Sequence, residues 1–339
     1  MNAPELLPVQ PAEVPRDRRT YIGGSDIAGI LGLQPRGWRT AVEIWQRKTL
    51  ADAAVEPETP AEKRKVLARG TIVEPLVAKM LAQLHGIDGV LVRNRRVQDL
   101  VFPHLAAEVD AEIPFPAVAH LFAERGVFPP SDIDPSIITV NLEIKTVHPF
   151  AAGEWGEEGT EDVPIHYAAQ VQWGLGVTGR DYAIVAALFG ADNLVLYPVI
   201  ADWETITAMR DKAHEFWTCV ETREPPLPQT ARDCGLLWPK DTGATVEADE
   251  RIAAAVTTLR ALKAKRKAFE DGEEGVDLLI REAMRDGTIL TFEGRELASL
   301  KTQATASIDA EKLKAEFPDA YKACRRTGTT RVLRLLKGD

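Results

Sequence analysis

Cysteine is scarce in this sequence. The three cysteines, Cys219, Cys234 and Cys324, are odd in number and widely spaced. They exclude a disulfide framework, and they are too few for a four-thiolate zinc or iron–sulfur site. Long apolar runs are also missing, since none approaches the ~20 residues that cross a bilayer. The Pro- and Glu-rich N-terminus lacks the apolar core of a secretory signal. We therefore expect an intracellular, cytoplasmic protein that makes no contact with a membrane.

Positive charge is not in excess either. The 41 Lys and Arg residues stand against 51 Asp and Glu residues, which gives a formal net charge of −10. This balance argues against a histone-like coat of positive charge. It remains compatible with a nucleic-acid enzyme that combines a local basic channel with an acidic metal site. With 339 residues, the chain has room for one large domain with appendages or for two modest domains.

Hydrophobic periodicity divides the chain into four parts. Residues 1–17 are expected to be a disordered lead and residues 224–246 a linker. Residues 18–223 are expected to form the main domain, and residues 247–339 a helical and small α+β extension. The main domain alternates helical spacing with period-two segments, which predicts an α/β or α+β core. The expected helices are 40–48, 166–175 and 203–220, and the expected strands are 90–94, 105–113, 138–147, 182–188 and 193–200.

Three segments are harder to assign. Pro75 lies inside a helical pattern, so we expect that helix to begin near residues 71–74, with the proline in its first turn. The Pro-rich segment 114–135 is expected to be a long loop. Residues 247–286 predict one long helix, or two helices broken at residues 271–275. The basic run 251–269 fits a phosphate-backbone contact and a solvated helix face equally well.

The strand Val140–Thr146 carries the clearest chemical signal. Because side chains alternate along a strand, Glu143 and Lys145 share one face while Leu142 and Ile144 point to the core. A carboxylate beside an ammonium suits metal-assisted hydrolysis, in which the lysine orients or deprotonates the attacking water. Asp110, also on a predicted strand, would supply a second oxygen ligand, and such ligands favour Mg²⁺ or Mn²⁺ over zinc. An E-x-K pair alone is more often a solvated strand edge.

Other polar positions have ordinary explanations when they are taken singly. Glu74 would be a favourable charge in the first turn of a helix. Gln170 would be a buried hydrogen-bonding residue. The sequence Gly23-Gly24-Ser25-Asp26 would be a tight turn with an Asp cap.

Taken in order, however, these positions resemble the PD-(D/E)xK nuclease superfamily. The set is Gly70-x-x-x-Glu74, Asp110, Glu143-x-Lys145 and Tyr167-x-x-Gln170. The sequence is similar, more closely, to the YqaJ-type viral recombinase family, which includes phage lambda exonuclease. Further matching phrases are residues 21–32, Val42–Trp45 with Lys48, and residues 164–172. The resemblance implies a restriction-endonuclease-like fold, with a mixed central sheet flanked by helices.

The resemblance also implies roles for individual residues. Asp110, Glu143 and the main-chain carbonyl of Ile144 would hold Mg²⁺, with Mn²⁺ as a substitute, and no nucleotide cofactor is expected. Lys145 would position and polarise water, Gln170 would support the site, and Glu74 would complete the shell of a second metal. The 5′-phosphate of the DNA would be bound by Ser25 and Arg18, with Arg19 as the near alternative.

The implied function is a 5′→3′ exonuclease that degrades linear duplex DNA from 5′-phosphorylated ends and leaves 3′ tails for recombination. By the same resemblance, the protein would be encoded by a phage or prophage in a bacterial cell. It would act with a single-strand annealing protein, and a trimeric ring is plausible. The alternatives are a sequence- or structure-specific endonuclease and a DNA-binding scaffold with a dead site. The 32 residues between Asp110 and Glu143 suggest an insertion at 114–135, whose Asp132 and Asp134 we expect at the surface.

Overall fold

The computed structural model describes residues 17–49, 61–325, 328 and 330–336. The expected disordered lead falls almost wholly at 1–16, outside the described residues. A five-stranded mixed sheet in the order β1-β2-β3-β4-β5 forms the centre of the first compact unit, which ends at Leu237. Only β3 and β4 are parallel. The strands are β1 Leu91–Gln98, β2 Ala106–Pro114, β3 Thr139–Val147, β4 Tyr182–Phe189 and β5 Asn193–Ile200.

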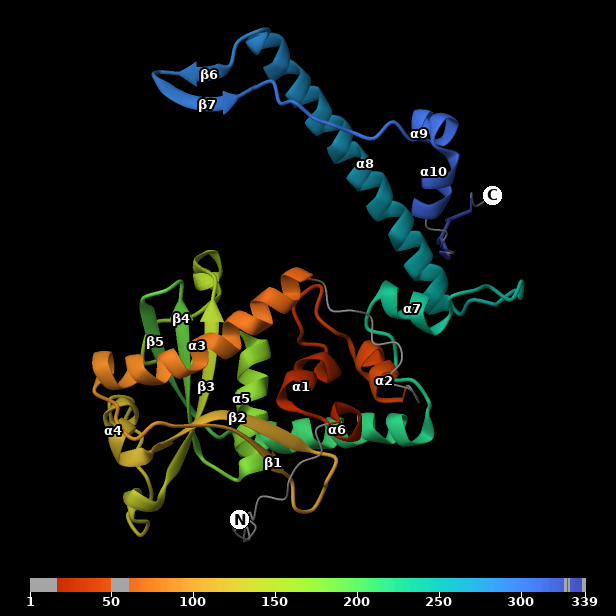
Figure 1. Cartoon of the computed structure of the whole chain (residues 1–339). Helices are drawn as coiled ribbons and strands as arrows, with labels where there is room; N and C mark the ends of the chain where they lie inside the picture. The colour runs from red at the N-terminus through yellow and green to blue at the C-terminus, as the bar shows by residue number, and fades with distance from the viewer. Residues whose placement is uncertain (1–16, 50–60, 326–327, 329, 337–339) are drawn as a thin grey trace. The chain divides into compact units, whose positions relative to one another are not determined.

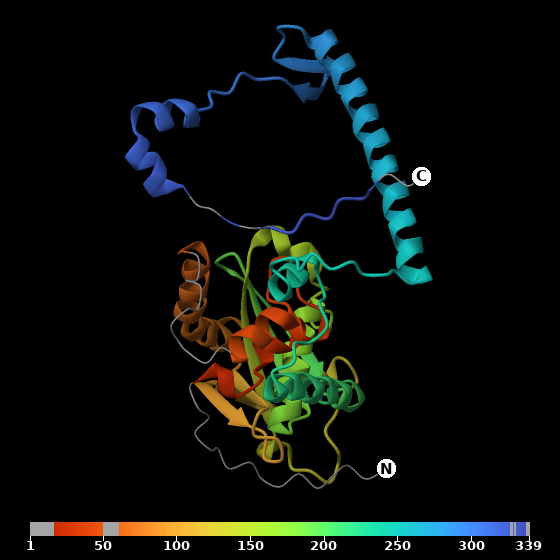
Figure 2. The same ribbon diagram turned by 90° about the vertical axis from the view of Figure 1, so that its right-hand side faces the viewer.

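Helices cover both faces of this sheet (Figures 1 and 2). On one face α1, α2, α5 and α6 pack around Trp173, which is 1% exposed, and on the other α3 and α4 pack around Leu142. The predicted α/β class, with a mixed central sheet flanked by helices, is confirmed. The helix bounds are α1 Gly24–Leu31, α2 Ala41–Thr49, α3 Ala61–His85, α4 Phe115–Ala123, α5 Ile165–Thr178 and α6 Trp203–Thr222. Short 3₁₀ turns span Arg18–Thr20, Pro135–Ile137 and Pro149–Glu154.

The crossover from β3 through α5 to β4 places α5 over one face of β3. Every residue of β4 is buried, as expected for a central strand covered on both faces. Glu143 and Lys145 of β3 point to the α5 side, whereas Leu142 and Ile144 join the core beneath α3 and α4. This is the alternation that the sequence of β3 predicts.

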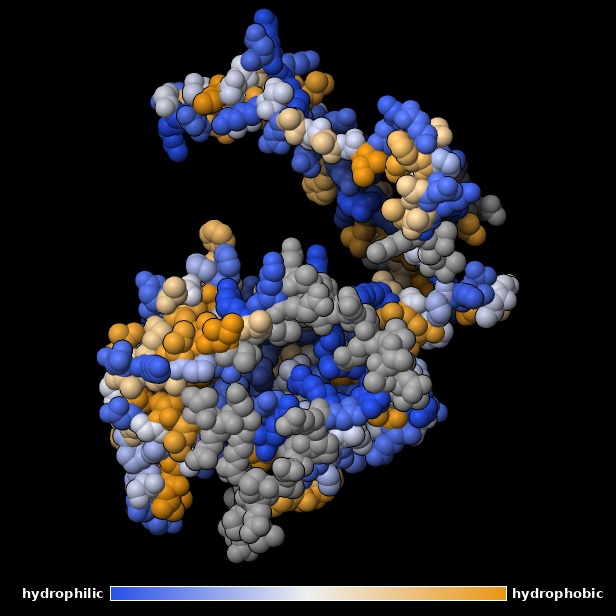
Figure 3. All heavy atoms as spheres, in the orientation of Figure 1, coloured by the Kyte–Doolittle hydropathy of each residue, from blue (hydrophilic) through white to orange (hydrophobic). Residues whose placement is uncertain are grey.

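Helix α3 begins about ten residues before the predicted start and contains Pro75 in its interior. The prediction of a start near residues 71–74 was therefore wrong. The residues before the proline are rich in Ala, Glu, Lys and Arg, which are strong helix formers, so the helix extends through a proline that removes one hydrogen bond. Val77 and Leu81 are fully buried against the sheet, while Ile72, Leu76 and Leu84 point outward, where Figure 3 shows apolar side chains gathered over α3.

The segment 114–135 is not a loop throughout. Residues 115–123 form α4, with Phe115, Val118 and Phe122 buried against Tyr182 and the sheet. Pro116 lies in the first turn, where its fixed φ favours a helix start and its missing N–H has no helical partner to lose. Pro114 and Pro116, which predict a loop by local rules, instead lie at the start of a helix. Asp132 and Asp134 are exposed, as expected.

The predicted linker contains a helix, α7 (Ala231–Leu237), that belongs to the first unit. Asp233 of α7 is fully buried and accepts a hydrogen bond from Thr40 at 2.6 Å. The Asp233 carboxylate also accepts hydrogen bonds from the backbone N–H groups of Gln229 and Thr230. These bonds cap the start of α7 and satisfy the buried carboxylate.

The second compact unit begins at Trp238. It contains α8 (Glu250–Met284), the hairpin β6 (Ile289–Phe292) and β7 (Arg295–Ser299), and the helices α9 (Ala310–Glu316) and α10 (Pro318–Cys324). Helix α8 is continuous through residues 271–275, so the first of the two predicted arrangements holds. Across the described residues, no helix has the length and apolar character of a bilayer span.

Candidate active site

Strands β2 and β3 separate where Asp110 and Glu143 are located. The described ladder between them runs from Pro114 and Thr139 to Ala111 and Leu142. At the next position the carboxylate of Asp110 replaces the strand partner, because its Oδ2 accepts the N–H of Ile144 at 2.8 Å. A side chain therefore satisfies a buried backbone donor, and the two strands part around an opening lined by carboxylates.

Glu143, Lys145 and Gln170 form a compact hydrogen-bonded group. Lys145 Nζ donates to Glu143 Oε1 at 2.5 Å and to Gln170 Oε1 at 3.2 Å, and Gln170 Nε2 donates to Glu143 Oε1 at 2.5 Å. The side chains of Lys145 and Glu143 are only 16% and 12% exposed. Gln170 comes from α5, so the crossover helix fixes the rotamers of two groups on β3.

Burial and neighbouring charges shift the pKa values of Asp110 and Lys145. Burial, reinforced by the neighbouring Glu143 carboxylate, raises the pKa of Asp110 to about 8. Burial opposes the charge of Lys145, but the carboxylates of Glu143 and Asp110 outweigh it and hold the lysine pKa above its ordinary value. Lys145 is therefore an ammonium at neutral pH, and the two carboxylates form a centre that a cation would stabilise.

The oxygen atoms at this opening suit a hard divalent cation. Asp110 and Glu143 supply carboxylates, and the carbonyl of Ile144 faces the Asp110 side because the N–H and C=O of a strand residue point the same way. Within the described residues, no group of three or more His, Cys, Asp or Glu side chains is arranged to hold a metal. Two carboxylates and a carbonyl suit Mg²⁺, which keeps several waters and accepts substrate phosphate oxygens as ligands.

Glu74 of α3 is half-buried and acts on the same centre, because its charge also raises the pKa of Asp110. It lies outside the lining of the cavity that contains Asp110 and Glu143. The structure thus brings four predicted residues together at the opening: Asp110, Glu143, Lys145 and Gln170. Glu74 lies farther away and acts on Asp110 through its charge.

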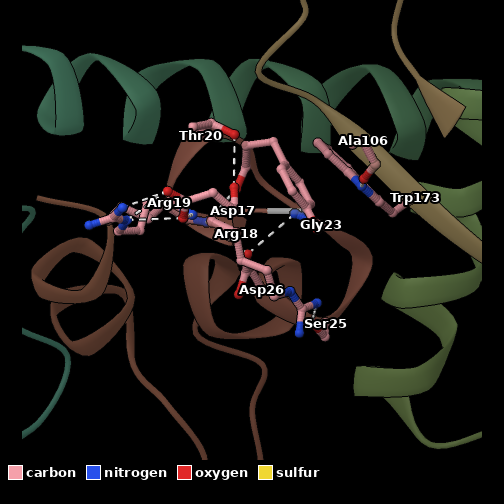
Figure 4. Close-up of polar contacts among 11 residues, drawn as sticks. Asp17, Arg18, Arg19, Thr20, Gly23, Ser25, Asp26, Ala106 and Trp173 are labelled. Atoms are coloured by element: carbon pink, nitrogen blue, oxygen red, sulfur yellow. Dashed lines mark hydrogen bonds and ion pairs between the residues drawn. The ribbon is translucent and has the colours of Figure 1, made fainter. Parts of the chain in front are cut away.

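Arg18 and Arg19 point to opposite sides of the N-terminal turn (Figure 4). Arg18 Nη2 donates to Ser25 Oγ at 2.6 Å, whereas Arg19 forms an ion pair with Asp17 at 2.6 Å. The buried Nε of Arg18 has no hydrogen-bond partner within the described residues. An unpaired buried N–H of an arginine is unusual, and it leaves a donor for a ligand.

A single cavity joins the Arg18 turn to the carboxylates. Its volume is about 150 Å³, and its lining includes Arg18, Ser25, Asp110, Glu143 and Gln170. The first residue of α1, Gly24, makes this proximity possible, because a Cβ there would lie 3.1 Å from Gln170 Cγ. Glycine therefore lets the start of α1 approach α5 closely, which brings Ser25 next to the group on β3.

Lys48, for which the sequence predicts no role, is central to this turn. The side chain of Lys48 is 2% exposed and pairs with Asp26 at 2.9 Å. Its Nζ also donates to the carbonyl of Arg18 at 3.0 Å and to that of Tyr21. A signal was present, since Lys48 shares a helical stripe with the apolar Ala41 and Ile44, and a lysine on a buried face needs a partner.

Comparison with known proteins supports one family. Residues 15–181 match the family model of the YqaJ-like viral recombinase domain. The chain is 25% identical over 320 residues to the uncharacterized protein YqaJ of Bacillus subtilis strain 168, covering 91% of this chain and 89% of that protein.

Two exonucleases are among the solved structures that a comparison of structures matches to this chain. The alkaline exonuclease from Laribacter hongkongensis is 13% identical with a TM-score of 0.42, over 61% of this chain and 90% of that chain. A phage-related exonuclease from Haemophilus somnus 129PT is 12% identical with a TM-score of 0.39, over 60% of this chain and 94% of that chain.

Proposed function

We propose that this protein, whose residues 15–181 are a YqaJ-like viral recombinase domain, is a metal-dependent 5′→3′ exonuclease of linear double-stranded DNA. It would hydrolyse phosphodiester bonds from 5′-phosphorylated ends and leave 3′ single-stranded tails for recombination. The observation that carries the proposal is the shared cavity, which is lined both by an arginine with an unpaired donor and by two half-buried carboxylates.

The Arg18 turn would bind the terminal phosphate. A guanidinium, the Ser25 hydroxyl and the amides at the start of α1 are donors of the kind that bind phosphate oxygens. Because these donors and Asp110 line one cavity, a strand whose 5′ phosphate binds at Arg18 would present a nearby phosphodiester to Asp110 and Glu143. Binding at the terminus would thus restrict cleavage to strand ends.

The residues of β3 would carry out hydrolysis. Bound Mg²⁺, or Mn²⁺ in its place, would supply charge neutralisation at the scissile phosphate. Lys145 has three ammonium N–H donors, of which two bind Glu143 and Gln170, so a third can hold the attacking water or a phosphate oxygen. Its raised pKa favours orientation and polarisation of the water over proton abstraction. Gln170 would keep Glu143 and Lys145 in position, and Glu74 would assist a second ion.

An endonuclease is the second candidate, because the same carboxylates would cut an internal bond equally well. Arg18 with Ser25 favours the exonuclease, since an internal phosphodiester offers no terminal phosphate to bind. A scaffold with a dead site is disfavoured by the intact Asp110, Glu143 and Lys145. We further propose, on family resemblance, a single-strand annealing partner, a trimeric ring around DNA, and action in the cytoplasm of a phage- or prophage-carrying bacterium.

Replacing Asp110 with asparagine should abolish Mg²⁺-dependent hydrolysis and weaken Mn²⁺ binding about tenfold or more, because a charged ligand is lost. Titration calorimetry with Mn²⁺ measures the binding without DNA. The matched control is Asp132→Asn, which removes an exposed aspartate and should change neither quantity. Unchanged Mn²⁺ affinity in Asp110→Asn would move the metal site elsewhere.

Replacing Arg18 with alanine should raise KM for 5′-phosphorylated duplex about 10- to 100-fold, the value of a lost charge-assisted hydrogen bond. The KM for the same duplex with a 5′-hydroxyl end should change by less than about threefold. The control is Arg19→Ala, since Arg19 is paired with Asp17 and points away from Ser25. An equal loss on both kinds of end would mean that the phosphate is bound by other residues.

A further inference from the structure

A second guanidinium, that of Arg96, lines the cavity and has no role in the site described above. Arg96 of β1 lies directly across the ladder from Glu108 of β2. Both residues line the cavity that contains Arg18, Ser25, Asp110 and Glu143. Two cationic side chains, one from the turn Arg18–Thr20 and one from β1, therefore line the same small cavity.

The pairing of Arg96 with Glu108 is loose. Arg96 Nε lies 3.4 Å from Glu108 Oε2, and the two side chains are 31% and 43% exposed. An ion pair of this geometry and exposure contributes little free energy, so an anion that enters the cavity can displace the carboxylate at small cost. By contrast, the pair between Lys48 and Asp26 in the same unit is 2.9 Å long and almost fully buried.

We infer that Arg96 is a second phosphate-binding residue of the cavity and that Glu108 competes with the DNA for it. In the free protein Arg96 pairs with Glu108 through a single contact. With DNA present, the guanidinium of Arg96 binds a phosphate of the strand, with which it can form two parallel hydrogen bonds. Glu108 has a second effect, because its carboxylate repels a phosphate unless Arg96 neutralises it. This inference rests on the proposed function, since it assumes that the cavity receives a DNA strand.

Competition predicts effects of opposite sign for the two residues. Glu108→Gln frees Arg96 and removes a repelling charge, so KM for 5′-phosphorylated duplex should fall about two- to fivefold. Arg96→Gln removes the cation and leaves Glu108 uncompensated, so KM should rise about 10- to 100-fold. The double variant should lie between the two single variants. The value of kcat should stay within about twofold throughout, because neither residue contacts Lys145 or Gln170 in the described contacts.

Binding of the duplex without hydrolysis provides an independent measurement. Fluorescence anisotropy in EDTA, over a range of salt concentrations, gives the dissociation constant and its salt dependence. Arg96→Gln should reduce the slope of log K against log salt by about one, the change expected for one lost phosphate contact. Arg232→Gln is the control, because this arginine is 69% exposed, pairs with Glu43 at 2.8 Å and lies outside the cavity lining.

The outcomes separate this inference from the proposed function. A rise in KM for Glu108→Gln, or an unchanged salt slope for Arg96→Gln, overturns the competition between Glu108 and DNA, even when the wild-type protein is an active exonuclease. If the wild-type protein binds DNA with the expected effects of both variants but releases no nucleotides, the exonuclease proposal fails and the phosphate contact stands.

Discussion

Replacing Lys145 with alanine is expected to lower the rate of DNA hydrolysis by about 10²- to 10⁴-fold, the usual value of one group that handles the attacking water. The ammonium is buried, held above its ordinary pKa by Glu143 and Asp110, and aimed by Gln170. Alanine removes the donor for the water and leaves Glu143 without its cation. The measurement is the single-turnover rate of nucleotide release from a 5′-labelled duplex in Mg²⁺.

The loss must be chemical and not a loss of folding or binding. Because Glu143 loses its cation, the urea midpoint of Lys145→Ala should fall, so the rates are compared under conditions in which both proteins are fully folded. The affinity of the variant for duplex in EDTA should stay close to that of the wild-type protein. Lys212→Ala serves as the matched control, since Lys212 is 60% exposed on α6 and pairs only with Glu215 in the described ion pairs. A near-normal rate for Lys145→Ala would refute the assignment of Lys145 as a catalytic residue.

Replacing Lys48 with methionine is expected to lower the free energy of unfolding by about 3–5 kcal/mol, because it leaves the buried Asp26 carboxylate without the ammonium that pairs with it. The loss should be visible as a lower urea midpoint. It should also disorder the Arg18 turn, since Lys48 Nζ binds the carbonyls of Arg18 and Tyr21. Lys212→Met, at an exposed site, should change stability by less than about 0.5 kcal/mol.

The pH dependence of this loss identifies its cause. Burial alone would raise the pKa of Asp26, but Lys48 and Arg18 outweigh burial and hold it below its ordinary value. A carboxyl with a depressed pKa in the folded state stabilises the protein above its unfolded pKa of about 4, and this contribution disappears as the pH falls through the folded pKa. The difference between wild type and Lys48→Met should therefore be full at pH 7 and shrink toward and below pH 4. An equal difference at both pH values would indicate lost packing and no ion pair.

The strand geometry of the site could be predicted because it depends on local alternation. Period two in Val140–Thr146 places Glu143 beside Lys145, and the structure has them in contact. The separation of β2 from β3 could not be predicted, because it depends on Asp110 accepting the N–H of Ile144, 34 residues away. The same holds for Lys48 with Asp26 and for Arg96 with Glu108, whose partners are fixed by the packing of separate elements.

The errors in the fold come from proline. Pro75 and the prolines around Phe115 were weighed as breakers by local rules, yet tertiary packing and helix-forming neighbours decide each case. In α4 the apolar side chains at positions 115, 118 and 122 follow a helical stripe, which marks the helix despite its prolines. The five strands of the central sheet and the helices α2, α5 and α6 were predicted to within about four residues, whereas α7 was missed inside the predicted linker.

The most direct test of the account is a gel assay in Mg²⁺ on blunt linear duplex labelled separately at each 5′ end, run beside a closed-circular plasmid. The account predicts that both 5′ labels are released as mononucleotides and that the circle stays intact, with no reaction in EDTA. Nicking or linearisation of the circle would contradict it, and would establish an endonuclease in which Arg18 and Ser25 serve only the structure of the N-terminal turn.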